Sequence, residues 1–183
     1  MAVTVRPWAA ELLYVWFRKL GPSDWFRGSN RVDAMLAQRF AHEWYALRHR
    51  PAKEFLASSD LARAAVLLFD QVPRNMFRDD PRAFASDSLA QEICRHSLDK
   101  GWHCSLSAQQ VQFLAMPLMH SEDLGDQSRC VALFARHVPG ALSFARNHHR
   151  MIAQFGRFPH RNEVLGRETT PAEKRAIDAG FTW

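Results

Sequence analysis

The chain has 183 residues, of which 47% are hydrophobic, and its 24 Lys and Arg against 19 Asp and Glu give a net charge of +5. This length accommodates one sizeable core and is short for two full domains, so we expect a single all-helical domain over residues 1–183. Acidic residues are interspersed with the basic ones, which argues against nucleic acid as a partner, and no apolar run approaches the ~20 residues that cross a bilayer.

The three cysteines, Cys94, Cys104 and Cys130, are isolated in the sequence and odd in number. This pattern argues against a disulfide framework and against a thiolate metal site, and it is typical of a reducing compartment. The segment from Met1 to Trp8 lacks the apolar core of a signal peptide. We therefore expect a soluble cytoplasmic protein with no membrane association, no bound metal and no cofactor.

Apolar residues recur at helical intervals through most of the chain, beginning with residues 8–17 and 35–47, on either side of a linker around Gly21, Pro22 and Gly28. Strong alternating runs and Asn-Gly or Asp-Gly hairpin turns are absent from the sequence. The fold class that this pattern predicts is all-α, and Ser107 with Gln110 and Thr170 with Glu173 have the spacing of capping boxes at helix starts. Helices of this length with short polar connections usually pack as antiparallel pairs, so we expect a compact bundle or a short superhelical array.

The first polar segment follows the apolar run 64–69, which places Asp70 and Gln71 at the end of a buried helix. Pro73 then forces the chain out of the helix, and three donors follow it. These donors are Arg74, Asn75 and Arg78. They could cap the last carbonyls of the helix, which is a structural role, or they could be turned toward a ligand.

The second polar segment contains Pro117 within a helical pattern, so we expect a kink just before His120, Ser121 and Glu122. His120, Glu122 and Asp123 supply ligand-type atoms, but their spacing matches no familiar zinc motif. A hydrogen bond between histidine and carboxylate is the simpler interpretation of this segment.

The third polar segment carries the densest set of donors in the chain. Gly156 is suited to the left-handed residue that ends a helix, and Pro159 holds the preceding residue extended, so the donors are presented from a fixed bend. These donors are Arg157, His160, Arg161, Asn162 and Arg167. His148 shares a helical face with Phe144 and Ile152, so we expect it to lie on or beside the packed side of the helix before the turn.

The three segments read DQVPRNMFR (70–78) with RAF (82–84), PLMHSED (117–123) with Gln127, and FGRFPHRN (155–162) with LGR (165–167). In this order they resemble the signature segments of an uncharacterised bacterial family, domain of unknown function 924. Val72 and Gln154 depart from the aromatic and basic residues that are usual there, and His148 rather than His149 occupies the usual histidine position. The resemblance covers most of the chain and implies an all-helical fold similar to tetratricopeptide-like superhelices. It implies no established reaction, cofactor or catalytic residue.

Two functions fit these residues. In the first, the polar segments bind a small anionic ligand, a phosphate or a carboxylate, with acid–base chemistry as an option. The ligand-binding candidates are Arg74, Asn75, Arg78, Arg157, Arg161, Asn162 and Arg167. The catalytic candidates are His120, His148 and His160, which would move protons, and Glu122, which would orient an imidazole.

In the second function, the protein is a helical interaction module that receives a peptide or a protein partner. The polar segments then only hold the helices in register. The arginines would pair with Asp70, Glu122, Asp123 and Glu163 in a polar network that locks the C-terminal segment onto the bundle.

Overall fold

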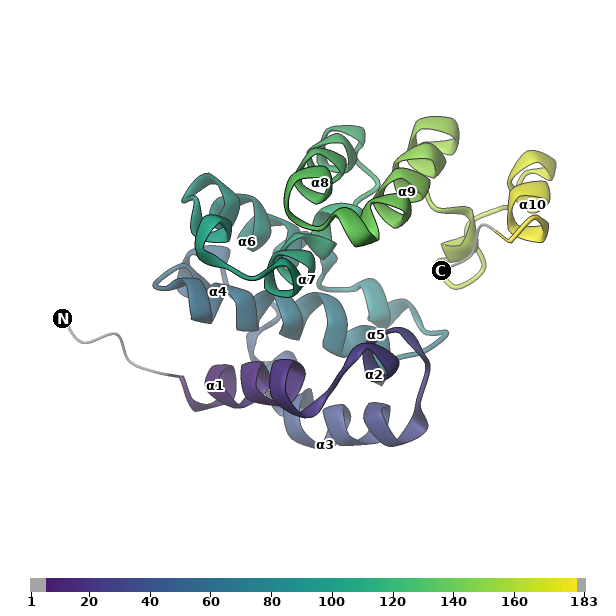
Figure 1. Ribbon diagram of the computed structural model, residues 1–183. Coiled ribbons are helices and arrows are strands. Elements are labelled where there is room, and N and C mark those ends of the chain that lie inside the picture. The colour runs from purple at the N-terminus through teal and green to yellow at the C-terminus, as the bar shows by residue number, and fades with distance from the viewer. Residues whose placement is uncertain (1–5, 181–183) are drawn as a thin grey trace. The chain divides into compact units, whose positions relative to one another are not determined.

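The computed structural model describes residues 6–180, and every regular element in that range is a helix (Figure 1). The all-α prediction is confirmed. Residues 1–5, on which the prediction of no signal peptide partly rests, lie outside the described residues. The α-helices are α1 Pro7–Tyr14, α2 Pro22–Phe26, α3 Asn30–Leu47, α4 Ser59–Val66, α5 Val72–Met76, α6 Asp87–Asp99, α7 Ala108–Met119, α8 Leu124–His137, α9 Leu142–Phe155 and α10 Pro171–Asp178.

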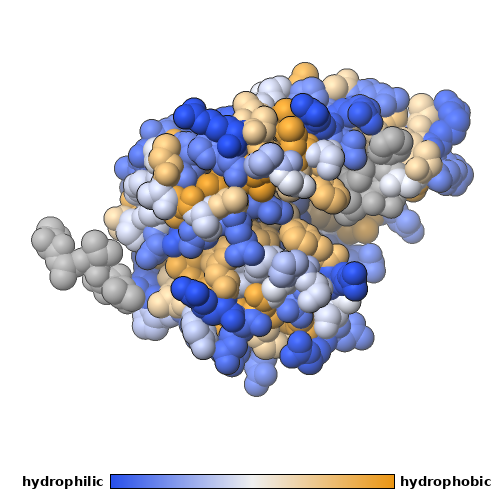
Figure 2. All heavy atoms as spheres, in the orientation of Figure 1, coloured by the Kyte–Doolittle hydropathy of each residue, from blue (hydrophilic) through white to orange (hydrophobic). Residues whose placement is uncertain are grey.

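The described residues form two compact units that divide between Pro117 and Leu118. The first unit contains α1 to α6 and most of α7, and the second contains the end of α7 with α8, α9 and α10. Hydrophilic residues dominate the face drawn in Figure 2, with smaller apolar areas between them. Within residues 6–180, no helix combines the length and the apolar character that crossing a membrane requires.

In the first unit, α4 packs against α1 and α6, and α3 packs against α5. Its core is aromatic, because Phe40, Trp44, Phe55 and Phe69 are all fully buried. The indole of Trp44 donates to the Ser86 hydroxyl at 2.9 Å, and that hydroxyl donates to the Phe69 carbonyl at 2.7 Å. The Trp44 indole, the Ser86 hydroxyl and the Phe69 carbonyl are thereby paired with one another, as buried polar groups require.

In the second unit, α8 and α9 pack against each other as neighbouring helices, and α10 contacts the short helical turn Pro159–Arg161 (Figure 1). A small apolar core forms from Met151, Ile152, Phe158 and Ala176. This core joins the last turns of α9 to α10 through the bend between them. The third polar segment of the sequence is therefore anchored by a buried phenylalanine.

The capping boxes expected from the sequence are present. The Ser107 hydroxyl accepts from the Gln110 amide at 3.3 Å, while the Gln110 side chain accepts from the Ser107 amide at 3.1 Å. Thr170 and Glu173 exchange the same two bonds at 3.2 and 2.8 Å. These pairs satisfy backbone donors that a helix start otherwise leaves open, so local sequence fixes where α7 and α10 begin.

Candidate functional site

The bend after α9 begins at Gly156, which has a φ of 69° and whose amide donates to the Ile152 carbonyl at 2.8 Å. A left-handed residue is the usual way to end a helix, and glycine adopts it at least cost. Phe158 is extended before Pro159, and a single 3₁₀ turn, Pro159–Arg161, follows. The local geometry predicted for the third polar segment is therefore confirmed.

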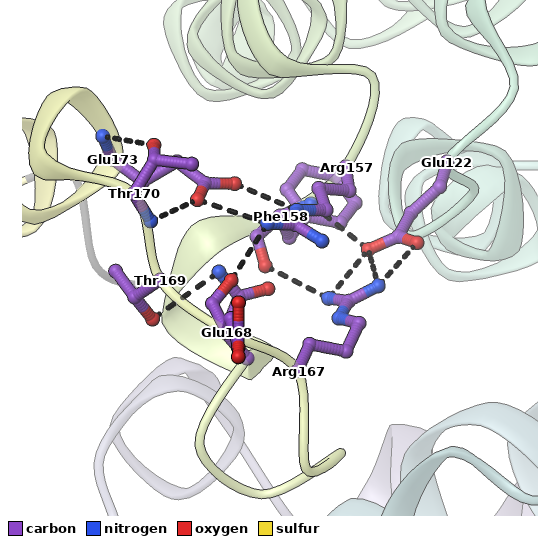
Figure 3. A network of polar contacts seen from close by, with 9 residues as sticks. Glu122, Arg157, Phe158, Arg167, Glu168, Thr169, Thr170 and Glu173 are labelled. Atoms are coloured by element: carbon purple, nitrogen blue, oxygen red, sulfur yellow. Dashed lines mark hydrogen bonds and ion pairs between the residues drawn. The ribbon is translucent and has the colours of Figure 1, made fainter.

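Phe158 is the centre of this bend, with its ring completely buried. Its amide donates to Glu122 Oε1 at 2.8 Å, and its carbonyl accepts from Arg167 Nη2 at 3.1 Å. Glu122 and Arg167 are themselves joined by hydrogen bonds of 2.9 to 3.2 Å, and Figure 3 shows them facing each other beside Phe158. The bonds of Glu122 are thus directed to Arg167 and to the backbone, so it fixes the bend and does not orient an imidazole through them.

Arg157, at the start of the bend, is directed to the N-terminus of α10 (Figure 3). Its guanidinium donates to both carboxylate oxygens of Glu173 at 2.6 and 3.0 Å and to the Glu168 carbonyl at 2.8 Å. The bond from Arg157 is the main cause that lowers the pKa of Glu173 to about 2. Because Glu173 also closes the capping box with Thr170, Arg157 secures α10 against the bend.

Asn162 is completely buried within the same bend. Its backbone carbonyl accepts from the Arg167 amide at 2.7 Å, and its Nδ2 donates to the Thr169 hydroxyl at 3.3 Å. These bonds close the loop between the 3₁₀ turn and α10. The side chain of Asn162 therefore acts inside the loop.

Two imidazoles and one guanidinium gather around the Phe158 ring, and a third imidazole lies beside one of them. The ring centroids of His148 and His160 each lie 5.6 Å from that of Phe158, and the Arg161 guanidinium carbon lies 4.5 Å from it. The His120 ring is 6.4 Å from the His148 ring, and the His120 carbonyl accepts from Arg161 Nη1 at 3.1 Å. We call His120, His148, His160 and Arg161 the imidazole cluster.

The four residues of the imidazole cluster differ in how deeply they are buried. His148 is 5% exposed and Arg161 is 7% exposed, whereas His120 and His160 are half-buried. His148 Nδ1 donates to the Phe144 carbonyl at 2.9 Å, which fixes the proton on that nitrogen. His148 and Arg161 thus form the buried side of the cluster, and His120 and His160 form its more accessible edge.

Burial, together with the neighbouring positive charges, disfavours protonation of His148 and His160. Burial lowers the pKa of His148 to about 3, with further lowering by His120, Arg161 and His160. Burial likewise lowers the pKa of His160 to about 4, together with Arg161, His120 and Arg167, while Glu122 acts in the opposite direction. These two imidazoles are therefore neutral at neutral pH, held beside a permanently charged guanidinium.

Gln127, in the first turn of α8, organises the backbone next to His120. It is completely buried, and its Nε2 donates to the carbonyls of Leu118, Met119 and Ser121 at 3.2, 2.7 and 2.7 Å. These carbonyls lie at the end of α7, where helical partners run out. Gln127 belongs to the second signature segment of the sequence, but its structural role could not be predicted there, since nothing local shows which carbonyls a glutamine will reach.

The first polar segment lies in the other unit and serves its own helix. Arg74 Nη1 donates to the Asp70 carbonyl at 2.6 Å, and Asn75 Nδ2 donates to the Gln71 carbonyl at 2.9 Å. Arg74 also binds both carboxylate oxygens of Asp87 at 2.8 and 2.9 Å. This is the cap that the sequence offered as the structural alternative, extended by an ion pair to the first turn of α6.

Arg78 closes the same segment by pairing with α3. Its Nε and Nη2 donate to the two carboxylate oxygens of Asp33 at 2.6 and 2.9 Å. The predicted site residues therefore separate into two groups. The second unit brings together His120, Glu122, His148, Arg157, His160, Arg161, Asn162 and Arg167, whereas Arg74, Asn75 and Arg78 are bonded within the first unit.

Among residues 6–180, no group of three or more His, Cys, Asp and Glu side chains has the arrangement needed to hold a metal ion. The imidazole cluster is a set of nitrogen donors at the Phe158 ring, with one guanidinium in it. Such a set can offer hydrogen bonds and positive charge to an anion, and its imidazoles can carry protons.

Comparison with known proteins places this protein in a family. Residues 12–180 match the model of a family described as bacterial protein of unknown function, DUF924, and the protein therefore belongs to that family. A solved structure of a protein of unknown function from Agrobacterium tumefaciens is similar, with 32% identity and a TM-score of 0.88 over 94% of this chain and 97% of that one. No protein with a curated description matches the sequence.

Proposed function

We propose that the second unit binds a small anion, a phosphate or a carboxylate, at the imidazole cluster. The observation that carries this proposal is the convergence of His148, His160 and Arg161 on the Phe158 ring, with His120 beside them. Apolar neighbours would bury this ring at less cost, because His148 and Arg161 lose hydration there and burial lowers the pKa of His148. An anion supplies the negative charge that this arrangement favours.

Each member of the cluster has a distinct part in the proposed binding. Arg161 supplies the permanent positive charge, and it is fixed by the His120 carbonyl and the Phe158 ring. The half-buried His120 and His160 supply the accessible edge. A bound anion raises the pKa of the neighbouring imidazoles, so anion binding and proton uptake are coupled. If a reaction follows binding, acid–base chemistry by these imidazoles is the class that we propose.

The remaining polar residues are proposed to hold the structure in place. Glu122, Arg157, Asn162 and Arg167 fix the bend that presents the cluster. The three donors of the first unit, Arg74, Asn75 and Arg78, cap and pair helices there. The proposal therefore keeps an anion site, as in the first hypothesis. It also gives most of the arginines the structural role that the second hypothesis assigned to them, which is to hold the helices in register.

Calorimetric titration with inorganic phosphate and with citrate tests the proposal. We expect saturable binding near pH 6 that weakens toward pH 8, since binding takes up protons, and the heat should change with the ionisation enthalpy of the buffer. Arg161→Gln should abolish it. Arg175→Gln removes an exposed cation from α10 and is the matched control for net charge. Absence of saturable heat with both anions, or full binding by a folded Arg161→Gln variant, would contradict the proposal.

A further inference from the structure

A second polar site lies between α8 and α9, away from the contacts of the imidazole cluster. It is a hollow of about 210 Å³ lined by Ser128 and Val131 of α8 and by Arg146 and His149 of α9. His149 follows His148 in sequence but has different contacts, because its Nε2 lies 3.3 Å from the Ser128 hydroxyl. The side chains of His148 and His149 therefore lie in two different sites.

The hydrogen bonds of Ser128 define the chemistry of this hollow. Its hydroxyl donates to the Leu124 carbonyl at 2.9 Å, and a carbonyl can only accept. The single hydroxyl proton is thereby used, so Ser128 accepts from the Nε2–H of His149. His149 does not act as a base toward Ser128 in this arrangement. The pair is a fixed wall of the hollow and not an activated nucleophile.

Arg146 provides the positive charge of the hollow. Its side chain is exposed, and Arg146 is not among the arginines that form ion pairs within residues 6–180. The guanidinium therefore keeps a planar fork of donors for an incoming partner. Val131 supplies an apolar wall, and Leu124, 47% exposed, lies one helical turn before Ser128 on α8.

We propose that this hollow binds the carboxylate group of a small organic acid. The guanidinium of Arg146 pairs with the two carboxylate oxygens, while Val131 and the ring of His149 contact the carbon part of the ligand. A singly charged carboxylate fits better than phosphate because one guanidinium is the only permanent charge of the lining, and the Ser128 proton is already used. This site is independent of the anion site proposed above.

The test is a titration of the protein with benzoate, followed by the NMR signals of the imidazole ring protons of its histidines. We expect a saturable shift of the His149 signal, assigned from a His149→Gln variant, and no such shift with the neutral analogue benzamide. Arg146→Gln should weaken benzoate binding about tenfold or more, since a charged hydrogen-bonding partner is lost. Arg150→Gln, an exposed arginine of the same helix, should leave it unchanged.

Four outcomes would overturn this inference. They are no shift of the His149 signal with benzoate, an equal shift with benzamide, unchanged affinity of Arg146→Gln, and tighter binding of inorganic phosphate than of benzoate at this signal. Arg161→Gln, which removes the charge of the imidazole cluster, should not affect the His149 response. If no anion binds at the imidazole cluster, the response of His149 to benzoate therefore still tests the site between α8 and α9.

Discussion

Glu122 and Phe158 are separated by 36 positions in the sequence, yet the Glu122 carboxylate accepts the Phe158 backbone amide at 2.8 Å. The same carboxylate pairs with Arg167, which in turn binds the Phe158 carbonyl. Both backbone groups of one buried residue are thus held by an ion pair. This arrangement fixes the position of the ring around which the imidazole cluster gathers.

Replacing Glu122 should loosen this bend. Glu122→Gln removes the charge that holds Arg167, and we expect the free energy of unfolding to fall by about 1.5–3 kcal/mol, the range for hydrogen bonds to charged groups. Urea denaturation measures this change. Glu163→Gln alters an exposed carboxylate of the same region and should have little effect. Equal stability of the two variants would show that the pair does not hold the bend.

The left-handed residue at the end of α9 gives a second prediction. Gly156→Ala places a side chain at a φ of 69° and should cost about 1 kcal/mol of stability. Gly140→Ala is the matched control, because Gly140 has no positive φ and its added Cβ meets no atom within 4 Å. A thermal melt should show the loss for Gly156→Ala alone, and a neutral Gly156→Ala would contradict the argument from backbone strain.

Gln127 gives a third prediction, on the turn that carries His120. Gln127→Met keeps the volume of the side chain but removes the donor to the carbonyls of Leu118, Met119 and Ser121. We expect a loss of about 1–3 kcal/mol, since the buried carbonyls lose their partner. Chemical denaturation reports it, and Gln112→Met is a control on α7, where the side chain is half-buried. A Gln127→Met protein as stable as the unmodified protein would contradict the role given to the Gln127 amide.

The pH dependence of stability follows from the histidines. In the unfolded protein, His148 and His160 have ordinary pKa values near 6.5. In the folded protein, the pKa of His148 is about 3 and that of His160 is about 4. As the pH falls, the two side chains therefore take up protons in the unfolded protein at a higher pH than in the folded protein. The unfolded state therefore binds more protons below pH 6.5, and stability falls as the pH decreases through this range. Carboxylates stay ionised down to about pH 5, so the histidines dominate between about pH 6.5 and 5.

His148→Gln should flatten this part of the profile of unfolding free energy against pH. His42→Gln, at an exposed position of α3, should leave the profile as it is in the unmodified protein. A profile that keeps its full slope in His148→Gln would mean that other groups take up the protons.

Local features of this fold were predictable from the sequence. The helical spacing, the capping boxes at Ser107 and Thr170 and the left-handed Gly156 are all present. Each depends on residues within a few positions of one another, so the sequence alone specifies it. The cap formed by Arg74 and Asn75 is local in the same way, and it was one of the two roles considered for these residues.

The ion-pair partners were less predictable, because they depend on which helices meet. Asp70 and Glu122 do pair with arginines, as the network hypothesis expected. Asp123 instead caps α8, its carboxylate accepting from the Asp126 amide at 2.9 Å. Glu173, the partner of Arg157, was identified only as part of a capping box. A carboxylate at a helix start already has a local partner in the sequence, so a second, distant partner is not predicted.

The convergence of His120 with His148 and His160 also required the tertiary structure. These residues are distributed over the end of α7, α9 and the bend, and only the packing around Phe158 brings them together. The sequence indicated each of them as a candidate, since imidazoles near turn-forming residues are suited to proton transfer. It placed Phe158 in a signature segment but did not show that its ring would bring these histidines together.

The anion site is tested most directly by the NMR signals of the imidazole ring protons of His120, His148 and His160 during a phosphate titration. We predict saturable shifts of these signals and a rise in the apparent pKa of His160 from about 4, because a bound anion favours the imidazolium. The signal of the exposed His42 serves as the internal reference. Signals and pKa values of the cluster that phosphate leaves unchanged would contradict anion binding there.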